Sequence, residues 1–194
     1  MPSTPTPRRL MHRRAIEVQV YARDDGLFDV EATLSDIKTR DIPLAAGTRR
    51  AGEPLHDMLL EVVVDRQLNI VEARATTRAM PYPGSCDALG DRYSRLVGLN
   101  LFQGFRQGVK SRLAGTQGCT HITEICNVLP TAVIQAFAGE VLDTREGSAD
   151  GTPPFQLDRC HALRRDGAVV QQHYPRWYRN EADPAAAAAA SNNN

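Results

Sequence analysis

The stretch AIEVQVYARDDGLFDVEATL, residues 15–34, decides the fold that this sequence predicts. In its first part Ile16, Val18 and Val20 alternate with polar side chains, which is typical of a strand with one buried face. The second part, LFDVEATL, alternates in the same way. Asp-Gly between two alternating runs is a strong signal for a tight turn, with Gly26 supplying the unusual backbone conformation. The stretch therefore predicts a β-hairpin.

A second hairpin is predicted further along the chain. LHDMLLEVVVD, residues 55–65, and LNIVEARATTRA, residues 68–79, both read as strands, and only RQ separates them. Residues 35–54 between the two hairpins are rich in glycine, proline and charge, which indicates an irregular link with room for a short strand. Two consecutive hairpins favour an antiparallel meander.

The second half of the chain changes to helical periodicity after the breaker MPYPGSC, residues 80–86. Apolar residues recur at helical spacing in three successive segments, of which the longest runs from Thr120 to Phe137. Pro130 within that segment is expected to kink the helix or split it in two. The predicted class is α+β: an antiparallel sheet of two hairpins followed by helices packed on one face.

The composition excludes several classes of function. Lys plus Arg equal Asp plus Glu at 23 each, so no net charge favours binding to nucleic acid or to an anionic membrane. No apolar run is long enough to cross a bilayer. The sequence contains neither a glycine-rich nucleotide-binding motif nor a Gly-x-Ser-x-Gly elbow. The partners that remain are another protein or a small anionic ligand.

The two ends of the chain differ in composition from its middle. Residues 1–12 are rich in proline, serine, threonine and arginine, and residues 181–194 are rich in alanine and asparagine. We expect a disordered lead at 1–12, a single α+β domain at 13–180 and a disordered tail at 181–194. Because the beginning lacks the apolar segment of a secretory signal, the expected location is cytoplasmic.

The segment GCTHITE, residues 118–124, is the first candidate site. Cys119 and His121 precede or open the predicted long helix, where the unpaired N–H groups favour a thiolate. With Glu124 one turn further, they form a plausible ligand set or a nucleophile–base pair. The alternative is that Cys119 is a small buried residue and His121 an ordinary surface residue.

Cys86 is a second candidate ligand because it lies in the loop between the predicted sheet and helices. If this connection folds back, Cys86 approaches Cys119, and two sulfurs, an imidazole and a carboxylate could bind zinc or iron. The alternative is a loop cysteine that has no partner.

His56 and Asp57 form a third candidate, with His56 as a general base. Adjacent residues of a strand face opposite sides of the sheet, so His56 and Asp57 can reach the same site only if a bulge interrupts the strand. Asp57 and His121 complete this catalytic set.

Four acidic residues near the first hairpin could also bind a metal, but the row is more typical of the solvated side of a strand: Asp25, Asp29, Glu31 and Asp36.

Several segments together resemble a bacterial family designated only as a domain of unknown function, DUF2889. The resemblance rests on RDDGLFDVEATLSDIK, PLHDMLLEVVVD, PYPGSCDALG, the long segment ending in GCTHITEI, and DRCHALRRDGAVVQQHYPRWY. It extends from about Arg13 to Arg179. This family carries no established activity.

The order of the predicted elements also resembles, more weakly, the U-type iron–sulfur cluster scaffolds. The resemblance implies that Cys86 corresponds to the first loop cysteine of that pattern, and Cys119 with His121 to its helix-start pair. The middle cysteine of the pattern has no counterpart here, and the histidine–cysteine order is reversed.

The sequence therefore favours a metal-binding accessory or scaffold-like protein with a Cys/His site at a helix start. One alternative is a small enzyme that uses histidine acid–base chemistry on a small anionic substrate, which Arg78, Arg92 or Arg106 would hold. The other alternative is a non-catalytic partner subunit that docks through an exposed apolar patch.

Overall fold

The structure is a computed structural model that describes residues 6–45, 47–147 and 150–180. The expected disordered lead lies in part, and the expected tail lies entirely, outside the described residues; residues 6–11 have no regular secondary structure. The chain divides into two compact units, residues 1–136 and 137–194. The boundary falls inside the segment 13–180 that the sequence suggested as one domain.

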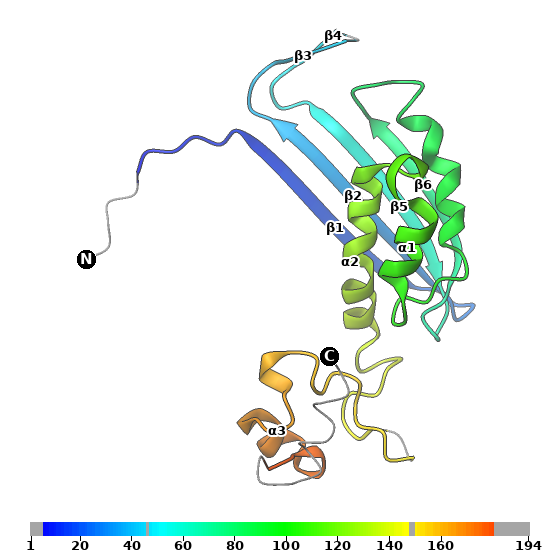
Figure 1. The fold of residues 1–194 in the computed structure, drawn as a ribbon, viewed down its shortest axis with the longest axis vertical. Coiled ribbons are helices and arrows are strands. Elements are labelled where there is room, and N and C mark those ends of the chain that lie inside the picture. The colour runs from blue at the N-terminus through cyan, green and yellow to red at the C-terminus, as the bar shows by residue number, and fades with distance from the viewer. Residues whose placement is uncertain (1–5, 46, 148–149, 181–194) are drawn as a thin grey trace. The chain divides into compact units, whose positions relative to one another are not determined.

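The first unit is built on a four-stranded antiparallel sheet (Figure 1). Its strands are β1 (His12–Ala22), β2 (Phe28–Lys38), β5 (Pro54–Val64) and β6 (Ile70–Ala79), in the order β1-β2-β5-β6. Both predicted hairpins are present, and Gly26 has the positive φ of 85° that the first turn requires. This confirms the prediction of an antiparallel meander.

The link between β2 and β5 carries a second, two-stranded sheet. It consists of β3 (Ile42–Leu44) and β4 (Gly47–Arg49), paired antiparallel. Near the base of this link the pairing of β2 with β5 shifts its register after Asp36. The shift interrupts the regular ladder between the two central strands next to Asp36, where the candidate site lies.

The helices follow the strands in sequence and lie on one face of the sheet (Figure 1), which confirms the α+β class. They are η1 (Asp87–Leu96), α1 (Phe105–Leu113), η2 (Gly115–Gln117) and α2 (Thr120–Phe137), of which η1 and η2 are 3-10 helices. Pro130 does not split α2, which runs without a break from Thr120 to Phe137. No helix in the described part of the chain has both the length and the apolar character needed to cross a membrane.

The core lies between this face of the sheet and the helices. Alternate residues of β2 and β5 are buried, as period-two patterning requires. The helices contribute large fully buried side chains: Tyr93, Leu96, Leu113, Ile122, Ile125 and Leu129. Asp36 is 2% exposed and is the one buried charged residue of the described chain, so the core ends at a polar site.

The second unit contains short helices joined by irregular segments. They are η3 (His161–Leu163), α3 (Ala168–His173) and η4 (Pro175–Trp177). Leu157 and Val170 are buried, and Asp158 accepts hydrogen bonds from the backbone and side chain of Arg165. The unit has few regular elements.

Candidate metal centre

Asp36 is the residue around which the site is built. It follows the buried Phe28, Val30, Ala32 and Leu34 at two-residue spacing, so its carboxylate enters the helix-covered face of the sheet. Its neighbours across the strands are Arg14 on β1 and His56 on β5. The register of three adjacent strands thus sets a cation, a carboxylate and an imidazole side by side.

Arg14 and His12 hold the Asp36 carboxylate from β1. Arg14 donates to both oxygens, from Nε at 2.8 Å and from Nη2 at 2.7 Å. His12 Nε2 lies 3.1 Å from Oδ1. Burial alone would raise the pKa of Asp36, but the hydrogen bonds and charge of Arg14, together with His56, lower it to about 2. The carboxylate is therefore charged at neutral pH.

His56 and His121 lie beside this carboxylate. His56 Nδ1 is 3.0 Å from Asp36 Oδ2, and His121 Nε2 is 3.7 Å from the same oxygen. The two imidazole rings are 3.8 Å apart between centroids and tilted by 31°. Burial is the main cause that lowers the pKa of each histidine; Asp36 opposes this effect, while Arg14 adds to it. Both rings are therefore neutral at pH 7, the form in which histidine binds metals.

The start of α2 is anchored so that His121 reaches the sheet. The buried Tyr93 hydroxyl accepts a hydrogen bond from the Cys119 N–H and donates to the Cys119 carbonyl, both at 2.9 Å. Its oxygen also lies 3.2 Å from Thr123 Oγ1. Burial raises the pKa of Tyr93 to about 12, so it stays protonated and able to donate. Tyr93 thus positions the residues on either side of His121.

Cys119 lies next to the histidine pair rather than among the donor atoms that face Asp36. Its Sγ is 3.8 Å from His121 Nδ1 and 4.0 Å from Met58 Sδ. The sulfur therefore contacts the ring nitrogen on the side opposite to Nε2. A partner at Nδ1 fixes the tautomer of a histidine whose Nε2 binds a metal.

The geometry of the three-residue cluster suits a metal ion. One donor atom from each of Asp36, His56 and His121 lies within 4.8 Å of the others, and no other set of this kind occurs in the described chain. Ligand atoms on a tetrahedral zinc, with bonds of about 2.0–2.1 Å, lie about 3.3–3.4 Å from each other. The 3.0 Å and 3.7 Å separations at Asp36 Oδ2 lie on either side of this value.

The structure brings some of the predicted site residues together and leaves others apart. His56, His121 and Cys119 meet, although they come from two distant segments. Asp57 faces the opposite side of β5 from His56, and its carboxylate lies 3.9 Å from the Arg78 guanidinium. Cys86 is half-buried just before η1 and is outside the three-residue cluster. Glu124 is exposed and outside the cluster, and it interacts with Arg14 only electrostatically.

Sequence reasoning did not assign Asp36, Arg14 and His12 to the site. The sequence pattern groups Asp36 with a row of solvated acidic residues, and it groups His12 with the expected disordered lead. A usable signal existed for Asp36, since it continues the two-residue spacing of the buried residues Phe28 to Leu34. A carboxylate in phase with a buried face needs a charged partner.

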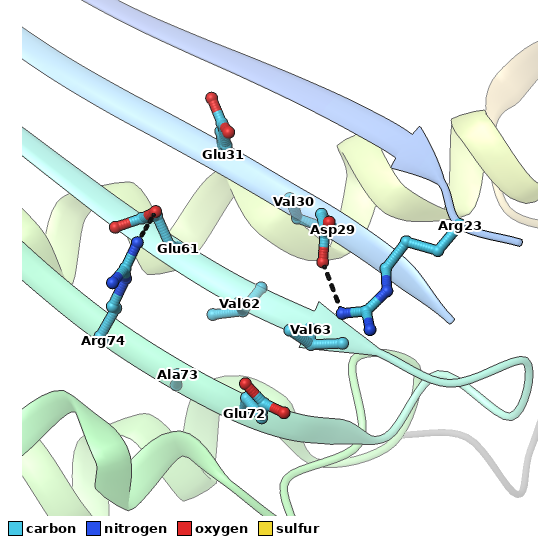
Figure 2. Close-up of a pocket in the computed structure, with 10 residues that line it drawn as sticks. All are labelled: Arg23, Asp29, Val30, Glu31, Glu61, Val62, Val63, Glu72, Ala73 and Arg74. Atoms are coloured by element: carbon cyan, nitrogen blue, oxygen red, sulfur yellow. Dashed lines mark hydrogen bonds and ion pairs between the residues drawn. The ribbon is translucent and has the colours of Figure 1, made fainter. Parts of the chain in front are cut away.

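A separate hollow of about 400 Å³ lies on the opposite, solvent-facing side of the sheet. Figure 2 shows its charged side chains, four of which form two ion pairs: Arg74 with Glu61 at 2.6 Å and Arg23 with Asp29 at 3.2 Å. Glu31 lies directly across the strands from Glu61. The hollow is thus a mixed-charge surface with no histidine or cysteine among its lining residues.

Comparison with known proteins gives a family and no function. The sequence pattern of a family described as "Protein of unknown function (DUF2889)" matches residues 12–135. The match begins at His12 and includes every residue of the cluster. No significant match was found among curated proteins or solved structures, and nothing found supports the weaker resemblance to U-type scaffolds. Because the match covers more than half of the chain, this protein belongs to the DUF2889 family.

Proposed function

We propose that this protein is a metal-binding accessory protein that holds zinc or ferrous iron through Asp36, His56 and His121. The observation that carries the proposal is the convergence of three donor atoms within 4.8 Å at the end of the core. Two imidazoles and a carboxylate are a ligand set that both ions accept. Three protein ligands leave a position for water or for a second molecule.

The charge and protonation state of the cluster support a divalent cation. The carboxylate is ionised and both imidazoles are neutral at pH 7, so the ligand atoms do not need to lose protons from charged groups. A metal bound at His56 Nδ1 would require the neutral ring to carry its proton on Nε2, and coordination would then replace the hydrogen bond between Nδ1 and Asp36 Oδ2. Arg14 keeps its hydrogen bonds to the carboxylate and orients it from outside the ligand set.

Elemental analysis of the untagged full chain tests this proposal. We expect about one metal ion per chain in the parent, and loss of the metal in His56→Ala and His121→Ala. His161→Ala is the matched control, since His161 is exposed in the second unit. Cys119→Ser is expected to keep the metal, because the sulfur lies at His121 Nδ1. A metal-free parent after growth with zinc and iron, or metal retained by His56→Ala, would overturn the proposal.

A second function is favoured by the order of contacts around His121. Its Nδ1 lies 3.8 Å from Cys119 Sγ and its Nε2 lies 3.7 Å from Asp36 Oδ2, the sequence of a nucleophile, a base and an orienting carboxylate. Both distances exceed those of a hydrogen-bonded triad, which are about 2.6–3.2 Å. This alternative needs the site to close on a substrate, so the metal proposal is preferred.

The rate of Cys119 alkylation separates the two functions. An acid–base enzyme predicts that His121→Ala slows alkylation at neutral pH by about tenfold, since His121 would remove the thiol proton. The metal proposal predicts a similar rate in metal-free parent and variant. Iodoacetamide labelling followed by mass spectrometry gives the rate at each cysteine, and the exposed Cys160 is the internal control.

A further inference from the structure

A cluster of three arginines gathers where η1, α1 and η2 meet. Arg112 of α1 donates from Nη1 to the backbone carbonyls of Arg95 at 2.7 Å and Val97 at 2.9 Å. It therefore satisfies carbonyls at the end of η1. Arg95 in turn donates to the Arg112 carbonyl at 3.4 Å. Each of these two side chains therefore donates a hydrogen bond to the backbone carbonyl of the other residue.

Arg92 joins this cluster through Gln117. Its Nη1 lies 3.5 Å from the carbonyl oxygens of Thr116 and Gln117. Arg92 and Arg95 share the Gln117 side-chain oxygen, each at 3.4 Å. These contacts are longer than the about 2.9–3.0 Å of a well-formed N–H···O bond, so most of the donor capacity of these two guanidinium groups is unused.

The cluster has no acidic partner among the described residues. Arg92, Arg95 and Arg112 donate hydrogen bonds to backbone carbonyls and to the Gln117 side-chain oxygen, which are all neutral. Elsewhere in the same unit Arg14, Arg23 and Arg74 each pair with a carboxylate. Three positive charges that converge on neutral oxygens create a local positive potential, although the chain as a whole has no net charge.

An open hollow of about 550 Å³ adjoins Arg95 and Arg112, and Arg92 contacts its wall through Gln117. It is lined by Arg95, Arg112, Gln117, Ser111 and Val97. Val97 is 41% exposed and gives the hollow an apolar wall next to the charged groups. A ligand with an anionic group and a small organic part suits this combination.

We propose that Arg92, Arg95 and Arg112 form a binding site for a phosphate group, carried by a small phosphate monoester or present as free phosphate. A phosphate monoester carries about −1.5 to −2 charges at pH 7 and three acceptor oxygens, which matches three guanidinium groups better than a single carboxylate does. Arg92 and Arg95 supply the unused N–H donors for the phosphate oxygens. Arg112 holds η1 and α1 together through its hydrogen bonds to the carbonyls of Arg95 and Val97. The site is distinct from the Asp36 cluster.

Calorimetric titration of the full chain with inorganic phosphate and with glycerol phosphate tests this site. Chloride keeps the ionic strength constant, and EDTA prevents a metal from holding the phosphate. We expect saturable binding that weakens by about tenfold in both Arg92→Gln and Arg95→Gln. Tighter binding of glycerol phosphate would identify the monoester as the preferred form, and equal binding would identify the phosphate group alone.

The control is Arg13→Gln, which removes the same charge from an exposed position of β1. We expect its affinity for phosphate to equal that of the parent. Far-UV circular dichroism checks the fold, and Arg95→Lys, which keeps the charge but loses the planar fork, replaces any variant that does not fold. No saturable binding by the parent, an equal loss in Arg13→Gln, or full affinity in either cluster variant would overturn the proposal.

Discussion

The two faces of the four-stranded sheet use charged residues in opposite ways. On the helix-covered face Asp36 is 2% exposed, and Arg14, His12, His56 and His121 all approach it. On the open face Glu61 and Arg74 form a pair in which Arg74 is 75% exposed. Burial makes the first group interdependent and shifts its pKa values, whereas water screens the second.

The largest effect is expected from Asp36→Asn. Loss of this buried charge leaves Arg14 without its carboxylate partner. We expect the free energy of unfolding to fall by about 2–3 kcal/mol. This is less than for a fully buried ion pair, because Arg14 is partly exposed. Urea denaturation of metal-free protein measures the cost. Glu61→Gln on the open face is the matched control, with an expected change below about 0.5 kcal/mol. Equal costs for the two variants would remove the distinction between the faces.

Acid should reveal the same difference. The folded-state pKa of Asp36 is lowered from 3.8 to about 2, so its charge stabilises the fold above pH 3.8 and this stabilisation is lost as the pH falls towards 2. The shift corresponds to about 2 kcal/mol. Urea midpoints at several pH values, compared between the parent and Asp36→Asn, isolate this part of the acid sensitivity. Parallel curves for parent and variant would contradict the assignment.

Tyr93→Phe tests the anchor of α2. It removes the hydroxyl that pairs with the backbone N–H and carbonyl of Cys119, which should cost about 1–2 kcal/mol and loosen the position of His121. Tyr21→Phe is the control, because Tyr21 is 47% exposed and its hydroxyl donates to the side-chain oxygen of the exposed Gln19. Chemical denaturation gives both values. A cost for Tyr21→Phe that equals that for Tyr93→Phe would show that the anchor is unimportant.

The smallest expected effect concerns the two histidines near neutral pH. Their folded-state pKa values lie below 6.5, so the unfolded chain binds protons first, and stability should fall as the pH drops below about 6.5. His56→Gln should reduce this slope in the presence of EDTA. Urea midpoints between pH 7.5 and 5 measure it. A slope that is the same in His56→Gln would mean that His56 does not titrate as described.

The fold was predictable because its patterns are local. Period-two alternation in residues 15–34, with Gly26 at the turn, specifies a hairpin, and helical spacing after residue 86 specifies what covers the sheet. Pro130 was expected to kink or split its helix, yet α2 is not split there. Tertiary packing of a long apolar stripe overrides the loss of one backbone hydrogen bond.

The candidate site was only half predictable because it depends on register and docking. His56, His121 and Cys119 attract notice by residue type, but Asp36 meets His56 only because the turn and link lengths align β2 with β5. His121 reaches Asp36 only because Tyr93 anchors the start of α2. Neither contact has a local sequence pattern. The phase of Asp36 within its strand was the one signal available in the sequence.

Anomalous X-ray diffraction from crystals of the full chain grown with zinc is the sharpest test of the proposal that Asp36, His56 and His121 share one metal ion. We expect one strong peak about 2.0–2.1 Å from His56 Nδ1, His121 Nε2 and Asp36 Oδ2. Crystals that show no peak there, or a peak coordinated by Cys119 Sγ without Asp36, would contradict it.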